Sequence, residues 1–449
     1  MAGYVGADGI RGKVSESLTV YKVFLTGRYV GELFRTEGRS RIVIGKDTRI
    51  SSDMLESAFA AGAASQGCDV LLAGVVPTPV IAWLAKSQDF AGGVMITGSH
   101  NLYMDNGILL FNGKGDPIGP EAEEKLENYI GGLTSINYAE ASDFGRIHPY
   151  PEGADLYCSW ITSVMNPDLS GKRIAVDLAN GSASSTVPRV LKALGAEVIE
   201  INHQPDGLNI NQNCGTSFPQ PIQAIVAERN CDCGLLFDGS ADRAVMVDRD
   251  GSILDGDHML YILITSYHRM GKEGYDRTAL TIASNSGTVS SLQEQGISVR
   301  VCRAGMRNLL TRMMEEDIIA GAENNGHIIL REFAGMPDGL LASLAVLKVS
   351  QDTGRLISEM LEGLNLLPYI FSSYRVVMKT TVIDDAEVQA VVNEVQELFG
   401  ANGRVILRAG ATEPVVRVLC EAEDAEVCRI GSERIAEVIQ RRFGTEDAA

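Results

Sequence analysis

A polar turn lies between two apolar segments in Gly234-Leu235-Leu236-Phe237-Asp238-Gly239-Ser240-Ala241-Asp242-Arg243-Ala244-Val245-Met246-Val247. The apolar residues predict two strands joined at Gly239. Asp238 and Asp242 can share a hard cation such as Mg²⁺, and Arg243 can bind a phosphate oxygen. Ser240 lies between them, at a position where a third carboxylate could also bind the cation. A hairpin with Asp and Gly chosen for turn geometry is the alternative, although two carboxylates and an arginine are more than a turn requires.

The chain before this turn alternates β-branched runs with helical patterns. Strands are predicted at 41–44, 69–72 and 93–96, and intervening segments such as 52–67 carry apolar residues at helical spacing. This alternation indicates parallel βαβ units. Two later blocks repeat one plan of strand, Asn/Gly/Ser turn, helix and strand, from 173–177 to 197–201 and from 278–283 to 298–301. Similar α/β domains in tandem are therefore expected.

The pattern changes from about residue 369. Strands are predicted at 374–378, 404–407 and 415–422, and helices at 385–399 and 425–442. Strands outnumber crossover connections here, so they are expected to be antiparallel. A smaller α+β domain is predicted to close the chain.

Size and charge limit the class of protein. A chain of 449 residues is long enough for three or four domains, at roughly 150 residues each. No segment approaches the ~20 apolar residues needed to cross a membrane, and the N-terminus lacks a signal-peptide pattern, so a cytoplasmic protein is predicted. A net charge of −19 without a Lys/Arg cluster disfavours nucleic acid. An anionic substrate is compatible with this net charge if a few arginines lie together in one cleft. The candidates are Arg11, Arg243, Arg303, Arg408 and Arg417.

The eight cysteines follow no framework spacing and predict reduced thiols. Cys231 and Cys233 share one face of a predicted apolar strand and lack a nearby Cys-x-x-Cys or histidine partner. Core packing is favoured for this pair over a metal or redox role.

A second polar loop, Thr97-Gly98-Ser99-His100-Asn101, follows the strand at 93–96. Open α/β sheets place reactive groups just beyond the carboxyl ends of their strands. The Ser99 hydroxyl can carry a phosphoryl group that His100 and Asn101 orient. The spacing taken alone favours an ordinary turn with a serine helix cap.

Two further loops offer polar groups. Residues Gly321-Ala322-Glu323-Asn324-Asn325-Gly326-His327 supply a carboxylate, two amides and an imidazole that suit sugar hydroxyls, although a hairpin loop explains them nearly as well. The segment Arg408-Ala409-Gly410-Ala411-Thr412-Glu413-Pro414, followed by Arg417, forms a plausible phosphate cradle. Taken alone, it is a loop with two arginines.

Together and in this order, the four loops resemble the α-D-phosphohexomutase family over essentially the whole chain. Other segments that carry the resemblance are Gly6-Ala7-Asp8-Gly9-Ile10-Arg11-Gly12, Gly45-Lys46-Asp47-Thr48-Arg49-Ile50-Ser51, Pro77-Thr78-Pro79, Asp105-Asn106-Gly107-Ile108 and Gly207-Leu208-Asn209-Ile210-Asn211. The likeness is greatest to the bacterial branch that acts on glucosamine phosphate.

The resemblance implies four α/β domains, three similar and mixed and the last a smaller α+β domain, at 1–152, 153–255, 256–367 and 368–449, around one cleft. It implies a mutase that interconverts 6-phospho and 1-phospho sugars through a phosphoserine and a bisphosphorylated intermediate. The implied cofactors are Mg²⁺ and a bisphosphorylated sugar activator, and the implied partner is a small sugar phosphate. The implied catalytic residues are Ser99, His100 and Arg11. The implied metal ligands are Ser99, Asp238, Ser240 and Asp242. The implied sugar contacts are Arg243, Glu323, Asn325 and His327. The implied phosphate contacts are Arg408, Gly410, Thr412 and Arg417.

Several positions depart from the family pattern. Ser240 replaces a metal-ligand carboxylate, so weaker Mg²⁺ binding is expected. Leu109 replaces a proposed proton-transfer lysine. The remaining departures are Ala241 for glycine, Asn325 and Gly410 for serine, and Met306 for an acidic residue.

Loss of one catalytic contact typically costs ~10²- to 10³-fold in rate. The departures together therefore indicate a changed substrate or a weakened catalyst. The alternative function is a catalytically impaired paralogue that acts as a sugar-phosphate sensor or a protein-interaction scaffold, and a weaker one is phosphatase-like leakage from Ser99. Whether the chain forms a homodimer is left open by the sequence.

Overall fold

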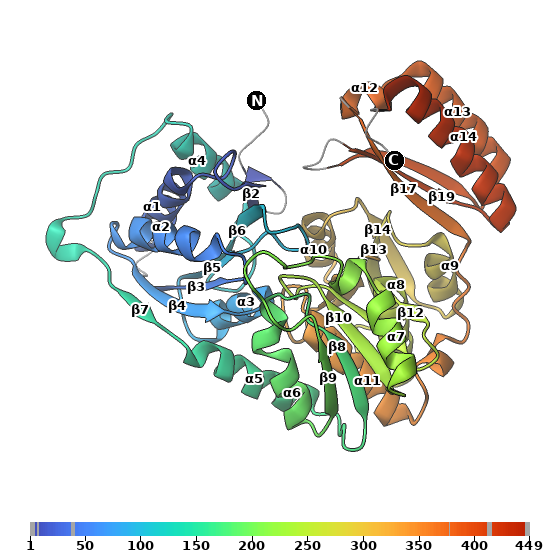
Figure 1. The fold of residues 1–449 in the computed structure, drawn as a ribbon, viewed down its shortest axis with the longest axis horizontal. Coiled ribbons are helices and arrows are strands. Elements are labelled where there is room, and N and C mark those ends of the chain that lie inside the picture. Colours follow the sequence, from blue (N-terminus) through green and yellow to red (C-terminus); the bar gives the residue numbers. More distant parts are fainter. Residues whose placement is uncertain (1–4, 7–8, 37–40, 377, 411–414, 445–449) are drawn as a thin grey trace. The chain divides into compact units, whose positions relative to one another are not determined.

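A computed structural model describes residues 5–6, 9–36, 41–376, 378–410 and 415–444 (Figure 1). The chain divides into two compact units. One comprises Met1–Thr281 and Arg300–Glu362, and the other comprises Ile282–Val299 and Gly363–Ala449. Within the described ranges, no helix is long and apolar enough to cross a membrane.

The first unit begins with a mixed seven-stranded sheet in the order β1-β2-β6-β5-β3-β4-β7. The strand β3 pairs in parallel with β4 and β5, which confirms the predicted βαβ units. The strands β6, β2 and β1 extend the sheet in antiparallel pairing. The bounds are β1 (Val5–Gly6), β2 (Gly9–Lys13), β3 (Arg41–Lys46), β4 (Asp69–Val75), β5 (Gly92–Ile96), β6 (Asp105–Asn112) and β7 (Ile147–Pro149).

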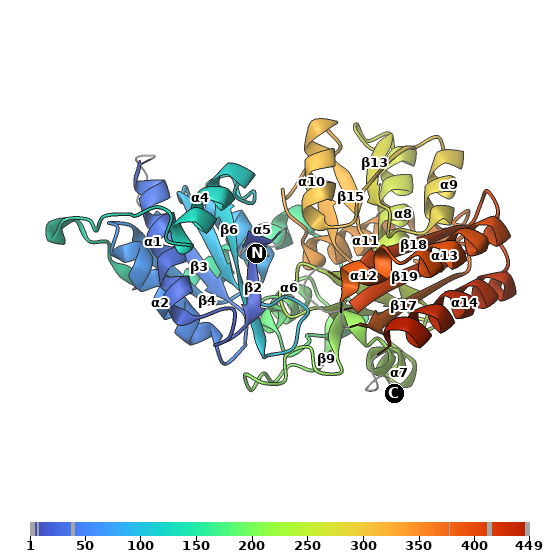
Figure 2. The same ribbon diagram turned by 90° about the horizontal axis from the view of Figure 1, so that it is seen from above.

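Helices cover both faces of this sheet. The helices α1 (Val20–Thr36), α2 (Ser52–Ala64) and α4 (Pro120–Ile130) share a core with the strands (Figure 2). The helices α1 and α2 touch closely, because a Cβ at Gly27 would lie 2.2 Å from the Phe59 carbonyl oxygen. On the other face, Ile81 of α3 (Thr78–Ser87) fills the space over Gly45 and Gly93. The sheet thus holds the end of β5, and with it Ser99, between packed layers.

The second sheet runs β12-β11-β10-β8-β9. Its hairpin pairs Phe237 with Ala244, and every residue of both hairpin strands is buried. The two strands predicted around the Asp238 turn are therefore confirmed. The bounds are β8 (Arg173–Asp177), β9 (Glu197–Ile201), β10 (Cys233–Phe237), β11 (Ala244–Asp248) and β12 (Ile253–Leu254), with helices α5 (Glu152–Met165), α6 (Val187–Ala193) and α7 (Gln220–Glu228).

The third sheet has the order β14-β13-β15-β16. The strands β13 and β15 are parallel, and the loop with Glu323 joins β15 to the antiparallel β16. The bounds are β13 (Arg277–Thr281), β14 (Ser298–Cys302), β15 (Ala320–Ala322) and β16 (Ile328–Leu330), with helices α8 (Gly256–Arg269), α10 (Met306–Glu315) and α11 (Gly339–Thr353).

A buried hydrogen bond joins two helices of this unit. The Tyr157 hydroxyl in α5 donates to Asp338 Oδ2 at 2.6 Å, and Asp338 caps α11 by accepting from the Leu341 N–H at 3.0 Å. Both side chains are buried. Burial raises the pKa of Asp338 to about 6, although the Leu341 and Tyr157 hydrogen bonds oppose the shift.

Stability is expected to depend on pH through Asp338. A folded-state pKa of about 6, above the ordinary 3.8, means that folding favours the protonated acid. The stability contribution is complete below pH ~4 and is lost as pH rises through 6, for a total of about 3 kcal/mol. The variant Asp338→Asn keeps the cap acceptor without titrating. Urea unfolding at pH 4 and pH 8 should show that the stability of this variant rises relative to that of the wild type as the pH rises. If the stabilities of the two proteins change in parallel with pH, Asp338 is not the group responsible.

The second unit is built on an antiparallel sheet in the order β17-β19-β18. The expected α+β domain with antiparallel strands is confirmed. The segment 282–299 joins this unit because the Ser286 hydroxyl donates to buried Glu421 at 2.6 Å, and Glu421 also pairs with Arg404 at 2.6 Å. The bounds are β17 (Tyr369–Arg375), β18 (Arg404–Ala409), β19 (Val415–Glu421), α9 (Ser286–Glu294), α12 (Lys379–Ile383), α13 (Ala386–Phe399) and α14 (Ala425–Phe443).

The strand predicted at 374–378 is wrong in its bounds. The strand β17 begins at Tyr369 because it pairs with β19 along its whole length, from Tyr369 opposite Glu421 to Arg375 opposite Val415. It ends at Arg375, and the short helix α12, which was not predicted, follows with Val382 buried in the core. A partner strand that is distant in sequence sets the length of this strand, so local pattern alone misplaced it.

Candidate active site

Ser99 lies in a buried loop at the carboxyl end of β5. Its backbone has a φ of 52°, a left-handed conformation that costs a non-glycine residue roughly 1–2 kcal/mol. The loop is held by two side chains from other segments. Arg49 and Asn211 donate to the Ser99 carbonyl oxygen at 2.9 and 2.8 Å, and both also donate to the Asn101 carbonyl oxygen at 2.8 Å. These contacts fix the direction of the Ser99 side chain.

Asp47 organises the support beneath Ser99. Its carboxylate accepts from Arg49 Nε at 2.9 Å and from the hydroxyls of Ser52 and Thr97 at 2.9 and 2.6 Å. Thr97 in turn accepts from the Ser99 N–H at 2.9 Å. Asp47 and Arg49 are fully buried. Asp47 and Arg49 lie in a segment that carries the family resemblance, but no role was predicted for them, although the polar run between β3 and α2 was the signal that could have indicated one.

The backbone of the Asp238 turn is anchored from three directions. Asn211 accepts from the Gly239 N–H at 2.9 Å, the Thr78 N–H donates to the Ser240 carbonyl at 2.9 Å, and the Gly339 N–H donates to the Ala241 carbonyl at 3.2 Å. Ala241 has a φ of 57°, so alanine is strained where a glycine would be relaxed. The turn therefore presents its side chains from a fixed backbone.

Four oxygens from the two loops meet in one cluster. Ser99 Oγ lies 2.9 Å from Asp238 Oδ2 and 3.1 Å from Ser240 Oγ. Ser240 Oγ lies 2.9 Å from Asp238 Oδ2 and 2.8 Å from Asp242 Oδ1. All four side chains are buried. Two hydroxyl protons serve these four contacts, so the cluster is rich in unshared acceptors.

The cluster fits a small divalent cation. Octahedral Mg²⁺ binds oxygen at 2.0–2.1 Å, which places adjacent ligands about 2.9 Å apart. The separations of 2.8–3.1 Å match this spacing as well as they match hydrogen bonds. Two carboxylates and two hydroxyls are hard oxygen donors, but the set carries one charge fewer than three carboxylates would. Among the described residues, no group of three or more His, Cys, Asp or Glu side chains is arranged to hold a metal.

Charge is unevenly distributed between the two carboxylates. Burial, reinforced by the negative charge of Asp242, raises the pKa of Asp238. Burial also opposes ionisation of Asp242, but the hydrogen bond and charge of His327, with the charge of Arg243, hold the pKa of Asp242 well below its usual range. Asp242 is therefore the permanent anion of the pair.

His327 links the turn to the loop between β15 and β16. Burial and Arg243 disfavour its charge, but hydrogen bonds to Asp242 and Glu323 outweigh them and raise the pKa of His327 to about 9. Its Nδ1 lies 3.1 Å from Glu323 Oε2, and its Nε2 lies 3.6 Å from Asp242 Oδ1 and 3.2 Å from Arg243 Nε. Arg243 can donate to Nε2 only when the ring is neutral, and the flanking carboxylates favour the protonated ring.

Glu323 is held ionised at the same loop. Burial raises its pKa, but His327 and the Gly305 N–H, which donates at 2.8 Å, outweigh burial and lower the pKa of Glu323 to about 2. The Asn325 side-chain oxygen accepts from the His327 N–H at 3.2 Å. The structure thus brings Arg243, Glu323, Asn325 and His327 together, as one polar group beside the oxygen cluster.

His100 is neutral. The charge of Arg243, then burial and the charge of Arg11, lower the pKa of His100 to about 2. Its Nδ1 is buried and has no hydrogen-bond partner among the described residues. A buried polar atom without a partner calls for an explanation, and a ligand that binds beside His100 would supply one. With two guanidinium groups near, that ligand is expected to be an anion.

Comparison with known proteins gives this arrangement a family. Four domain models of the phosphoglucomutase/phosphomannomutase family match the chain: α/β/α domain I at residues 2–136, domain II at 155–251, domain III at 255–366 and the C-terminal domain at 374–438. The chain belongs to this family.

Individual relatives agree with the family match. The chain is 38% identical over 446 residues to a phosphoglucosamine mutase of Caldicellulosiruptor saccharolyticus, with 98% of this chain and 99% of the relative covered. It is 35% identical over 448 residues to the Bacillus subtilis phosphoglucosamine mutase, with 99% and 100% covered. The expected family and fold class are confirmed, and the chain is a sugar-phosphate mutase of the intramolecular phosphotransferase class.

Solved structures share the fold. A phosphoglucomutase/phosphomannomutase family protein of Burkholderia thailandensis superposes with a TM-score of 0.79 at 22% identity, covering 97% of this chain and 98% of that one. An N-acetylphosphoglucosamine mutase of Aspergillus fumigatus, solved with GlcNAc-6P and magnesium, gives a TM-score of 0.70 at 15% identity, with 98% and 96% covered.

The phosphate-binding candidates of this phosphohexomutase lie in the second unit. Arg408 and Arg417 are directly opposite each other on β18 and β19, so their side chains share one face of the sheet. The Gly410 N–H donates to the Val415 carbonyl at 2.7 Å, and Lys379 donates to the Gly410 carbonyl. Lys379 was not singled out from the sequence. Thr412 lies outside the described residues.

The cysteines of the phosphohexomutase are all free and buried. Burial raises the pKa of the Cys231 and Cys233 thiols. Buried thiols with raised pKa values behave as small apolar side chains, which agrees with the packing interpretation.

Proposed function

We propose that this mutase interconverts the 6-phosphate and 1-phosphate of glucosamine through a phosphoserine at Ser99. One observation carries the proposal. The Ser99 hydroxyl is buried within 3.1 Å of Asp238 and Ser240, residues 139 and 141 positions away, and next to a neutral His100 whose Nδ1 lacks a partner. A serine that served only as a turn residue would not need this convergence.

The phosphoryl group moves from Ser99 Oγ to a hydroxyl of the bound sugar phosphate. The P–O bond to Ser99 breaks as the P–O bond to the sugar forms, which leaves a sugar bisphosphate. The bisphosphate then turns around and returns its other phosphoryl group to Ser99. A bisphosphorylated hexose from solution, acting as activator, replaces a lost phosphate on Ser99. In-line transfer of this kind depends on positioning and charge stabilisation.

Other residues position the substrate and neutralise the charge of the phosphoryl group. Mg²⁺ bound by Asp238, Ser240, Asp242 and an oxygen on Ser99 would neutralise charge on the moving phosphoryl group. Arg11 and His100 are proposed to contact that group's oxygens. The sugar hydroxyl proton ends on the Ser99 oxygen that the phosphoryl group leaves. Leu109 cannot carry that proton, and His100, with its pKa lowered to about 2, is too weak a base to take it. Arg243, Glu323, Asn325 and His327 bind sugar hydroxyls. Arg408, Gly410, Thr412 and Arg417 bind the phosphate that does not react. We propose four domains, at 1–152, 153–255, 256–367 and 368–449. The last of them contains the residues that bind the phosphate that does not react.

Isomer exchange tests the proposal. The protein is incubated with glucosamine 6-phosphate, Mg²⁺ and a trace of hexose 1,6-bisphosphate, and the 1-phosphate is followed by ³¹P NMR. We expect the two isomers to equilibrate, and no exchange in the Ser99→Ala variant. A wild type that performs no better than Ser99→Ala, yet is stabilised against heat by the sugar phosphate, would show a binding protein instead.

Restoring a carboxylate at Ser240 is expected to tighten metal binding. The variant Ser240→Asp adds a charged oxygen ligand, and we expect the dissociation constant for Mg²⁺ to fall by about tenfold or more. Isothermal titration with Mg²⁺ measures the change directly. The control is Ser142→Asp, which adds the same charge at an exposed serine. Equal effects from both variants would show that Ser240 does not face the metal.

A further inference from the structure

Gly239, within the Asp238 turn, packs directly against two other backbone segments. A Cβ at Gly239 would lie 2.8 Å from the Ser99 carbonyl oxygen, and a Cβ at Gly181 would lie 2.7 Å from Gly239 Cα. Both distances are shorter than a real Cβ contact, so a side chain at either glycine would push the segments apart. The backbone position of Gly239 therefore sets how close the Asp238 turn comes to Ser99.

The turn at 179–182, which follows β8, holds Gly239 in that position. Ser182 donates to the Gly239 carbonyl oxygen twice, from its backbone N–H at 3.0 Å and from its hydroxyl at 2.9 Å. Ser182 is fully buried. The Ala179 carbonyl oxygen accepts from the N–H of Asn211 at 3.0 Å, and the side chain of Asn211 holds the Ser99 loop. One turn thus supports both halves of the oxygen cluster.

Thr48 binds the same turn from the segment that supports Ser99. Its hydroxyl donates to the carbonyl oxygen of buried Asn180 at 2.6 Å, across 132 residues of sequence. Ala179 and Asn180 both have left-handed backbones, with φ of 51° and 47°. Successive residues in this conformation persist only where surrounding contacts hold them. The Thr48 hydroxyl supplies one such contact, and it ties the support of Ser99 to the support of Gly239.

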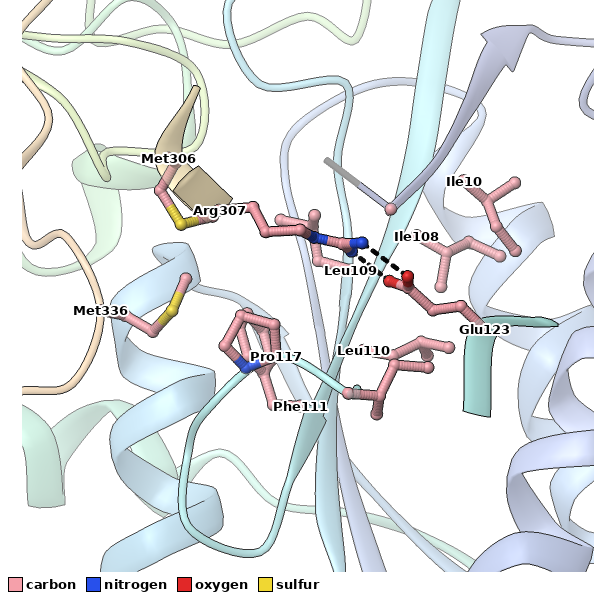
Figure 3. A pocket seen from close by; sticks show the side chains of 12 residues that line it. Ile10, Ile108, Leu109, Leu110, Phe111, Pro117, Glu123, Met306, Arg307 and Met336 are labelled. Carbon is pink, nitrogen blue, oxygen red and sulfur yellow. Dashed lines mark hydrogen bonds and ion pairs between the residues drawn. The ribbon is translucent and has the colours of Figure 1, made fainter. Parts of the chain in front are cut away.

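The Ser99 loop also rests on β6, where packing is close. The Thr97 N–H donates to the Gly107 carbonyl oxygen of β6 at 3.0 Å. A pocket beside β6 has a volume of about 30 Å³, which is far below the roughly 300–1,000 Å³ of small-molecule sites (Figure 3). Its lining includes the side chains of Leu109, Leu110, Phe111, Met306 and Met336. A pocket of this size adds no ligand subsite to the candidate active site.

We propose that Thr48 and Ser182 are positioning residues of the mutase. Through the turn at 179–182 they hold the Ser99 hydroxyl in register with the Asp238 turn. The inference rests on the proposed function, because it concerns the same phosphoryl transfer. Register matters for that step, since a misplacement of about 1 Å can lower the rate of a reaction by ~10²-fold.

Removal of the Thr48 hydroxyl tests the proposal. Valine has the shape of threonine without the hydroxyl, so Thr48→Val leaves the Asn180 carbonyl oxygen without this donor. We expect kcat to fall by about tenfold or more and KM for glucosamine 6-phosphate to change by less than about twofold, because the proposed sugar and phosphate contacts lie on other loops. Thr48→Ser keeps the hydroxyl and should retain the wild-type kcat. A wild-type kcat in Thr48→Val would overturn the proposal.

Binding of Mg²⁺ gives a second readout that does not depend on turnover. The implied ligands come from the Ser99 loop and from the Asp238 turn, so loss of register should weaken Mg²⁺ binding by about threefold or more in isothermal titration of Thr48→Val. Ser182→Ala should show the same effects to a smaller degree, because its backbone N–H still donates to Gly239. If Thr48→Val fails to fold, Ser182→Ala decides the question by the same two measurements.

Thr278→Val is the matched control. Thr278 is buried, and its hydroxyl donates to the Ala320 carbonyl oxygen at 2.9 Å, so the variant removes the same kind of hydrogen bond between β13 and β15. We expect Thr278→Val to lower the melting temperature without changing kcat or the affinity for Mg²⁺. Equal losses of kcat in Thr48→Val and Thr278→Val would show a general effect of destabilisation and would remove the positioning role.

The outcomes separate this inference from the proposed function. If the wild type exchanges no isomers but Thr48→Val weakens Mg²⁺ binding and Thr278→Val does not, the register stands and the proposed function falls. If the wild type exchanges isomers and Thr48→Val and Ser182→Ala match it in both measurements, the proposed function stands and the positioning role falls. A wild type that neither exchanges isomers nor binds Mg²⁺ would remove both.

Discussion

Replacing Ser99 with alanine is expected to lower the mutase rate by at least about 10⁴-fold. The hydroxyl is the atom that carries the phosphoryl group, and loss of a nucleophile removes the pathway itself, whereas loss of a single supporting contact costs ~10²- to 10³-fold. The fold should survive, because Ser99→Ala removes one hydroxyl from a loop whose backbone is held by Arg49 and Asn211. The measurement is isomer exchange, paired with a melting curve for each protein.

Intact mass spectrometry provides the control. Ser240 Oγ lies 3.1 Å from Ser99 Oγ and is the only other serine hydroxyl in the oxygen cluster of the described structure, so it is the natural alternative acceptor. Wild type and Ser240→Ala should each carry one phosphoryl group, and Ser99→Ala should carry none. A phosphoryl group that persists in Ser99→Ala and disappears in Ser240→Ala would transfer the role to Ser240.

Replacing Arg49 with leucine is expected to destabilise the first unit by about 3–5 kcal/mol. The guanidinium is fully buried against Asp47 and donates to the carbonyl oxygens of Ser99, Asn101 and Leu102. Leucine would leave a buried carboxylate and carbonyl groups without partners. The measurement is the shift of the urea midpoint, with mutase activity followed in parallel because the Ser99 loop loses its support.

Two variants check this account of Arg49. Arg35 is exposed and pairs with Glu32 at 2.8 Å on the surface of α1. Its replacement by leucine should lower the free energy of unfolding by less than about 1 kcal/mol. The double variant Asp47→Asn/Arg49→Leu should recover part of the loss, since no unpaired charge remains. If Arg35→Leu and Arg49→Leu destabilise equally, the buried network contributes nothing specific.

Prediction from the sequence succeeded where a signal was local. The turn at Asp238 and the loop at Ser99 each follow a run of apolar residues that forms a buried strand, so their positions at strand ends could be read directly. The roles of residues that act at a distance were missed. Arg49 and Asn211 donate to the Ser99 carbonyl oxygen, and Asp47 holds Arg49 in place. Every residue has a backbone carbonyl, so the sequence does not indicate which one such a side chain will bind.

Leu109 and Met306, which depart from the family pattern, also show that the sequence does not reveal which distant residues lie together. They lie far apart in the sequence and looked like two unrelated losses of polar groups. The structure places both in one pocket, where each apolar side chain is in apolar surroundings. A charged residue at either position would need a partner there. The change can thus be explained as one alteration of the site.

The sequence by itself determined the family, the alternation of strands and helices in the α/β part of the chain and the four polar loops, because strand and helix periodicity and tight turns are properties of neighbouring residues. Only the tertiary structure decided that Ser99 and Ser240 lie 3.1 Å apart, that His327 is shared by Asp242 and Glu323, and that one pocket contains both Leu109 and Met306. Each of these depends on packing between segments separated by up to about 200 residues. Packing of that kind is decided by burial and hydrogen bonding across the whole unit, and no local pattern encodes it.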